Sequence, residues 1–282
     1  MKKIFFISIF CLSFFWFNTN TVNAQVNDGI YEKEHVPSRK RVKYSYLREA
    51  DVMWKKRIWR IIDLREKINH PLYFPTQKLG DRMSLMQLFL WGITNEGLTV
   101  YSTDDDNFSA PMTRKQVEIE MGAVADTIPI TNPETGEEEM QIIPGEILTS
   151  EIKQFIIKEE WYFDRQLSVM KVRIIGICPV RFFIKDDDAT KTLRKTRVFW
   201  VYFPEVRRIL ANHAAFNPYN DAERRTFDDI FEKRYFNSFI IQESNVYNDR
   251  PINSYAQGVE GLLEAERIKD KLFKVEQDLW EY

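Results

Sequence analysis

The stretch of residues 155–203 constrains the fold of this chain more than any other. It contains three runs dense in β-branched and aromatic residues, at 155–164, 169–183 and 197–203. Runs of this length and composition favour strands over helices. The polar segment 185–191 between the second and third runs is typical of a turn. We therefore expect an antiparallel meander of three long strands, with the rest of the chain packed around it.

The remaining segments alternate between helical and strand patterns, which predicts an α+β fold with an antiparallel sheet and flanking helices. The run 57–64 is ambiguous, but β-branched residues dominate it and Pro71 follows closely, so a strand is favoured over a helix. An apolar stripe and a C-terminal stop at Asn95 and Gly97 predict a helix over residues 84–95, and capping residues indicate further helices that begin at Thr113 and Asp221. The other expected helices cover 46–54, 204–210 and 258–282, and the other expected strands cover 98–101, 126–130 and 140–143. Residues 239–241 form a further apolar cluster.

The N-terminus has the pattern of a secretory signal peptide. A basic start with Lys2 and Lys3 precedes an apolar run over residues 4–17, and Ala24 supplies the small residue expected before a cleavage site. The apolar run is short for a membrane span, so a retained anchor is the weaker alternative. Cys11 lies inside the apolar run, away from a lipoprotein acylation site. The sequence thus predicts an exported mature chain without a transmembrane span.

Four segments are expected along the chain: a signal peptide (1–24), an extended arm (25–45), one α+β domain (46–257) and a C-terminal helix (258–282). The arm has little apolar content and is locally basic around Arg39, Lys40 and Arg41. Two interpretations of the arm remain open. It is either a mobile leader or a segment that becomes ordered on a neighbouring subunit.

Charge and cysteine content exclude some classes of protein. After removal of residues 1–24 the chain keeps 38 basic against 42 acidic residues, a formal charge of −4, which argues against a nucleic-acid binder. Cys178 is then the single cysteine, so an internal disulfide is ruled out for that chain. Aromatic residues make up 14% of the sequence, which indicates a large core or large interfaces.

The sequence contains no catalytic constellation. Cys178 lies in the most apolar strand run, where burial raises the pKa of a thiol instead of activating it. The histidines at 35, 70 and 213 lack the spacing of metal ligands. The acidic runs 104–106 and 186–188 lack the glycine and final glutamate of a calcium loop. We expect no catalytic, cofactor-binding or metal-binding residues, with an exported enzyme or small-molecule-binding protein as the alternatives.

The C-terminal segment has the pattern of an amphipathic helix with a narrow apolar stripe. Such a helix needs a surface to lie on. The sheet of the same chain is one candidate partner, and we favour the other, a neighbouring subunit or partner protein bound along the helix. Together with the basic residues of the arm, the stripe forms the candidate interface, whose residues are Ala265, Ile268, Leu272, Val275, Leu279, Arg39, Lys40 and Arg41.

Several sequence blocks, in order along nearly the whole mature chain, resemble the gliding-motility protein N family, GldN, also called PorN. The two longest come early, at residues 49–60 and 62–75. Later blocks lie at 164–166, 168–170, 172–179, 200–205, 226–231 and 243–247.

The resemblance implies a periplasmic component of the type IX secretion system, whose machinery also supports gliding. It implies assembly with other copies and with the lipoprotein GldK (PorK) into a ring beneath the outer membrane. That ring is linked to the inner-membrane proteins GldL (PorL) and GldM (PorM). The family supplies no catalytic residues, so the resemblance implies a structural subunit without a cofactor.

Overall fold

The structure, a computed structural model, describes residues 36–123, 126–131, 138–143, 145, 147–184, 191–220, 222–223 and 225–280. The chain divides into two units, Met1–Glu34 and His35–Tyr282, and every described residue belongs to the second. The predicted signal peptide, the first part of the arm at 25–35 and the acidic run 186–188 lie outside the described residues.

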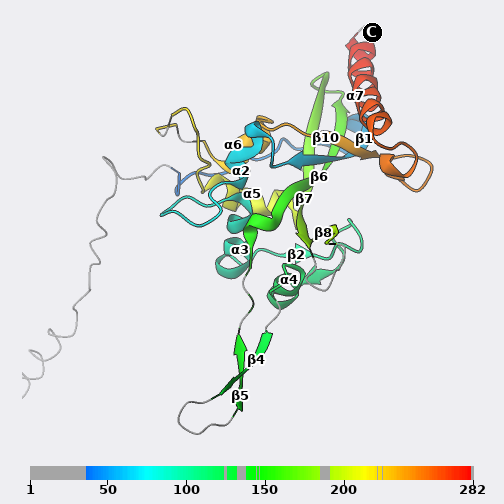
Figure 1. Cartoon of the computed structure of the whole chain (residues 1–282). Coiled ribbons are helices and arrows are strands. Elements are labelled where there is room, and N and C mark those ends of the chain that lie inside the picture. Colours follow the sequence, from blue (N-terminus) through cyan, green and yellow to red (C-terminus); the bar gives the residue numbers. More distant parts are fainter. Residues whose placement is uncertain are drawn as a thin grey trace, which may run out of the picture. The chain divides into compact units, whose positions relative to one another are not determined.

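An eight-stranded antiparallel sheet organises the fold and confirms the α+β prediction (Figure 1). Its strands follow the order β10-β1-β6-β7-β9-β2-β3, and β8 also pairs with β7. A separate two-stranded sheet pairs β4 (Asp126–Thr131) with β5 (Glu138–Ile143), at the two predicted strands. The strands of the large sheet are β1 (Val52–Asp63), β2 (Val100–Tyr101), β3 (Pro111–Met112), β6 (Ile152–Asp164), β7 (Val169–Ile184), β8 (Leu193–Arg197), β9 (Trp200–Tyr202) and β10 (Phe239–Glu243).

The predicted meander is present, but its third strand is divided in two. Strands β6 and β7 pair along almost their whole lengths, and both β8 and β9 pair with the opposite edge of β7. Between β8 and β9 the chain turns Val198 and Phe199 into the interior. Pro179 lies opposite this break, and its carbonyl accepts a hydrogen bond of 3.0 Å from Val198 N. Because proline has no N–H to give, a continuous ladder is interrupted at this point.

The helix predicted over residues 46–54 is wrong. A single 3₁₀ turn, η1 (Glu49–Asp51), precedes β1, and Val52 already pairs with Asp164 of β6. The run 57–64 forms part of β1, as predicted. A twelve-residue strand that pairs with a neighbour on each side makes more hydrogen bonds and packing contacts than a short helix at this position could make. Tertiary pairing therefore overrides the local helical pattern.

Helices fill the connections between strands. Capping boxes at Ser84 and Thr113 confirm the predicted starts of α3 (Leu85–Asn95) and α4 (Arg114–Glu120). The start predicted at Asp221 is wrong, because Thr226 caps α6 through Asp229. The other helical segments are α2 (His70–Tyr73), α5 (Phe203–Ala211), α6 (Phe227–Glu232), α7 (Val259–Trp280), η2 (Lys67–Asn69), η3 (Thr149–Glu151) and η4 (Ile252–Ser254).

The largest hydrophobic core lies between one face of the sheet and the helices α2, α3, α5 and α6. Strand residues Ile62, Phe155 and Ile157 are fully buried there. Phe89 of α3 meets Phe155 edge to face, with ring centroids 6.2 Å apart. Adjacent residues point to opposite faces of a sheet, so Ile61 and Ile156 lie on the other face. We call the face that carries Phe155 and Ile157 the helical face and the other the second face.

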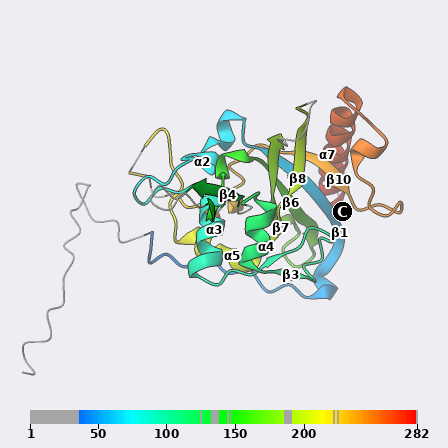
Figure 2. The same cartoon turned by 60° about the horizontal axis from the view of Figure 1, so that its bottom comes forward.

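The second face carries a smaller cluster that includes Trp59, Ile156, Cys178, Val180 and Trp200. The loop at residues 102–110 covers part of it, and Phe108 of that loop packs against the cluster. Helix α7 lies beside β10 in both Figure 1 and Figure 2 and forms a third cluster with the sheet.

Candidate interaction surfaces

The cysteine and histidine side chains considered for catalysis or metal binding have structural roles in the fold. Cys178 is fully buried in β7, and burial raises the pKa of its thiol to about 12. His213 Nδ1 lies 2.9 Å from the carbonyl of Ile209, and His70 begins α2. In the part of the chain that the structure describes, no group of His, Cys, Asp or Glu side chains is arranged to hold a metal ion.

The acidic run at 104–106 has a role that its sequence does not suggest. We expect a solvated turn there, and Asp104 and Asp105 are exposed. Asp106 instead accepts a hydrogen bond of 2.7 Å from Trp59 Nε1 and pairs with Lys158 Nζ at 3.1 Å. Lys158 is 2% exposed, and burial is the main cause that lowers its pKa. Asp106 therefore fastens the loop to the second face of the sheet.

Polar contacts join the described part of the arm to its own chain. Arg39 binds Asp229 of α6 through two hydrogen bonds of 2.7 and 2.8 Å. Arg41 donates to the carbonyl of Pro204 in α5. Lys40 is exposed. Of the three basic candidates in the arm, Arg39 and Arg41 are thus engaged within the chain.

Tyr44 completes this attachment of the arm. Its hydroxyl donates to Glu232 at 2.8 Å, and the guanidinium of the buried Arg207 lies 4.2 Å from the centre of its ring. Burial and the carboxylate of Glu232 both raise the pKa of the Tyr44 hydroxyl. Asp228 also binds Arg207, at 2.9 Å. Arm and helices therefore share one charged network along α5 and α6.

The predicted stripe of α7 faces the sheet of its own chain. Ala265, Ile268 and Leu272 are buried against a cluster that includes Ile58 and Ile240. Helix burial of this kind contributes roughly 1.5–3 kcal/mol for each large side chain removed from water. These three side chains are consequently not available to a partner protein.

The rest of the stripe and the exposed side of α7 remain open to solvent. Val275 and Leu279 are half-buried. Val259, Leu262 and Phe273 are 72%, 59% and 58% exposed. Spacings of three and eleven residues bring these three to one side of a helix with 3.6 residues per turn. We call Val259, Leu262 and Phe273 the outer stripe.

The apolar residues of the outer stripe are present in the sequence, but charged residues between them interrupt the helical pattern. Glu266 and Asp270 lie between Leu262 and Phe273 on the same side of the helix, so the apolar pattern is interrupted. The buried stripe of Ala265, Ile268 and Leu272 is more regular, so it is the apolar face that the sequence pattern predicts.

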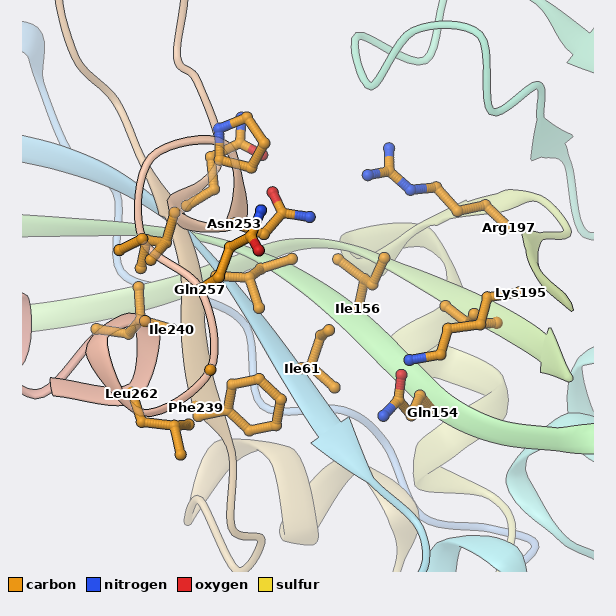
Figure 3. Close-up of a pocket in the computed structure, with 18 residues that line it drawn as sticks. Ile61, Gln154, Ile156, Lys195, Arg197, Phe239, Ile240, Asn253, Gln257 and Leu262 are labelled. Carbon is orange, nitrogen blue, oxygen red and sulfur yellow. The ribbon is translucent and has the colours of Figure 1, made fainter. Parts of the chain in front are cut away.

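A groove lies on the second face of the sheet, beside the part covered by the loop at 102–110. It has a volume of about 760 Å³. In Figure 3, Ile61 and Ile156 lie at its floor, Lys195 and Arg197 approach from β8, and Leu262 lies at the opposite side. The polar side chains of Asn253 and Gln257 complete the wall formed by η4 and the start of α7.

The groove combines an apolar floor with a positive wall. Lys195 and Arg197 are exposed, and they are the charged residues among those that line it. None of these lining residues, all within the described part of the chain, carries a carboxylate. A ligand with apolar side chains and negative charges is the best complement to such a surface. Individually the lining residues are common types, so the sequence alone does not reveal the groove.

Among the residues that the structure describes, none of the helices combines the length and apolar character needed to cross a membrane. A family model described as "Gliding motility associated protein GldN" matches residues 47–281. No curated protein matches the chain.

Proposed function

The chain belongs to the GldN family of gliding motility associated proteins, and from this premise we propose that it is a structural subunit of the type IX secretion machinery. In this proposal the mature protein resides in the periplasm. It assembles with further copies and with a GldK-like (PorK-like) lipoprotein into a ring under the outer membrane, and the ring engages GldL-like and GldM-like motor proteins. Its role is to build an interface and not to catalyse a reaction.

The observation that carries this proposal is the matched family combined with the outer stripe of α7. The helix is anchored to the body by its buried side, so it holds Val259, Leu262 and Phe273 in fixed positions. Apolar side chains on a rigid helix can insert into a groove of a partner at low entropic cost. The partner-facing role expected for the Ala265, Ile268 and Leu272 side of the helix therefore moves to the outer stripe.

Affinity isolation from cell envelopes tests the assembly role. The variant Val259→Asp/Phe273→Asp, which leaves the groove-lining Leu262 unchanged, should lose most co-purifying partner protein, together with gliding and secretion, while its melting temperature stays within a few degrees of the native value. The reason is that both side chains are exposed, so the substitutions act on an interface and not on the core.

The matched control is Leu79→Asp/Ile119→Asp, since these side chains are 63% and 60% exposed and lie outside α7. It introduces the same chemistry at similar exposure and should assemble normally. Normal recovery of partners with the α7 variant would rule out the outer stripe as the interface. Loss of partners with both variants would show that added charge, and not position, is responsible.

A fractionation experiment tests the location. Mature protein that begins at Gln25 should appear in the periplasm or bound peripherally to the outer membrane. Cytoplasmic protein that retains Met1 would contradict the proposed location, and the assembly role would then need a different compartment.

A further inference from the structure

The groove beside α7 has an apolar floor and a positive wall. Its floor crosses β10, β1, β6 and β7, since Phe239, Ile61, Ile156 and Val180 all line it. The positive wall of β8 lies next to β7. Neighbouring strands are about 4.8 Å apart, so a segment that runs from β10 to β8 covers roughly 19 Å.

Residues 25–35 of this chain have the matching chemistry. The segment Gln25 to His35 contains Val26, Ile30 and Tyr31 as large apolar residues. Its acidic residues are Asp28, Glu32 and Glu34, opposed by Lys33 alone, which leaves two net negative charges with the histidine neutral. The groove contributes the two positive charges of Lys195 and Arg197. The two surfaces are therefore complementary in both charge and polarity.

An extended conformation would bring the useful side chains of this segment to one side. Side chains at alternate positions of an extended chain share a face, and the even positions place Val26 and Ile30 together with Asp28, Glu32 and Glu34. In such a conformation Lys33 would point the opposite way. About six residues at roughly 3.3 Å each span the 19 Å of the floor, so the eleven residues of the segment are long enough.

The position of the arm indicates which groove the segment meets. Arg39 is bound to α6, whose apolar side chains belong to the core on the helical face of the sheet. In Figure 1 and Figure 2 the blue start of the described arm lies on the side of the molecule away from α7. The described part of the arm therefore begins on the side of the molecule away from the groove.

We propose that residues 25–35 of one copy bind the groove between β8 and α7 of a second copy, with Val26 and Ile30 on the apolar floor and Asp28 and Glu32 at Lys195 and Arg197. This inference deepens the proposed role as a ring subunit and rests on it for the presence of neighbouring copies. It assigns the groove as the acceptor and the N-terminal segment as the donor of a contact between copies.

Disulfide trapping between two differently tagged populations tests this proposal. Both consist of the whole chain that follows residue 24. One carries Ile30→Cys and the other carries Asn253→Cys, which is exposed on the groove wall. Cys178 stays in place because it is fully buried. Oxidation of the mixture should produce a disulfide-linked heterodimer that contains both tags.

Charge reversal sharpens the test. Lys195→Glu/Arg197→Glu on the acceptor should lower the yield of heterodimer about tenfold or more, because like charges then face each other. Adding Asp28→Lys/Glu32→Lys to the donor should restore the yield. The matched control, Lys78→Glu/Lys274→Glu on the acceptor, changes two exposed lysines outside the groove and should leave the yield unchanged.

Three results would overturn the proposal: no heterodimer, a heterodimer that is insensitive to the charge reversal, or a disulfide within one chain when both cysteines are placed in the same molecule. The assay uses purified protein, whereas the proposed function is tested in cell envelopes. Failure of trapping with normal recovery of partners would therefore reject this contact alone and leave the ring role intact.

Discussion

The two faces of the central sheet differ in how they are covered. Helices seal the helical face, and strand residues such as Phe155 and Ile157 lose all contact with solvent there. The second face is covered in part by one loop, which is held by the buried Lys158 and the half-buried Asp106, and is open at the groove. One sheet therefore supports both a dry core and a partly polar surface.

This difference separates stability from recognition. Apolar burial on the helical face supplies the non-directional free energy that holds the domain together. The second face has charge pairs and a groove, which contribute less to stability and, in the contact proposed above, would distinguish one partner from another. Substitutions on the two faces should consequently differ in both size and kind.

The largest expected effect on stability is found by comparing two isoleucine-to-alanine substitutions, one on each face of the sheet. Ile157→Ala should lower the free energy of unfolding by about 2–5 kcal/mol, because its site on the helical face is fully buried. Ile61→Ala at the half-buried groove floor should cost about 1 kcal/mol, since solvent already reaches that side chain. Equilibrium denaturation measures both, and equal losses would show that the groove is closed in solution.

The next effect concerns the pair that fastens the loop. Lys158→Met should lower the free energy of unfolding by about 1–3 kcal/mol, because Asp106 loses its cation while Trp59 still binds it. Adding Asp106→Asn should recover part of the loss. A double-mutant cycle by denaturant titration checks the coupling, and strictly additive losses would mean that the two side chains do not interact.

A glycine controls how closely the loop approaches the sheet. A Cβ atom at Gly176 would lie 2.5 Å from the ring of Phe108, so Gly176→Ala must displace that ring. We expect a loss of about 1–2 kcal/mol, most of which Phe108→Ala should cancel in the double variant. Thermal unfolding of the two single variants and the double variant measures these losses. A double variant that is much less stable than Phe108→Ala alone would show that the strain comes from a contact other than the one with Phe108.

The smallest effect is a dependence on acid pH at the end of β1. Hydrogen bonds from Arg65 lower the pKa of Asp63 to about 2. An unfolded aspartate titrates near pH 4, so the native carboxylate contributes stability above about pH 4 that is lost as pH falls toward 2. Asp63→Asn should cost about 1 kcal/mol at pH 7, and the difference from the native protein should shrink below pH 4.

Denaturation at several pH values measures this dependence. The exposed Asp278→Asn is the control and should leave the stability unchanged at pH 7. A difference between Asp63→Asn and the native protein that stays constant from pH 7 to pH 2 would contradict the role assigned to the Arg65 contact.

Local patterns in the sequence predicted the helical face well. Runs dense in β-branched and aromatic residues placed β6 and β7, an apolar stripe located α3, and a capping box located the start of α4. These signals depend on neighbours along the chain, so they can be read without knowledge of distant contacts. The helix expected over residues 46–54 failed because β6 supplies its hydrogen bonds from more than a hundred positions away.

The groove and the surface that covers the stripe of α7 could not be predicted in the same way. The groove brings together residues from Ile61 to Leu262, and no single segment shows their convergence. The stripe of α7 was evident from its spacing, but spacing does not identify the surface that covers it. Register in the sheet places Ile58 and Ile240 under Ala265 and Leu272, and this register is a property of the whole fold.

The attachment of the arm has a consequence for the order in which the molecule forms. Arg39 binds Asp229, which lies 190 positions later in the chain. During synthesis the arm therefore emerges long before its binding site on α6 exists, and docking is among the last contacts to close. Until then the tether keeps the arm at a high effective concentration near its own α6, so the α6 of a neighbour competes only where finished copies are crowded together. The local density of finished copies, and not the sequence alone, then decides whether each arm closes on its own chain or links two chains.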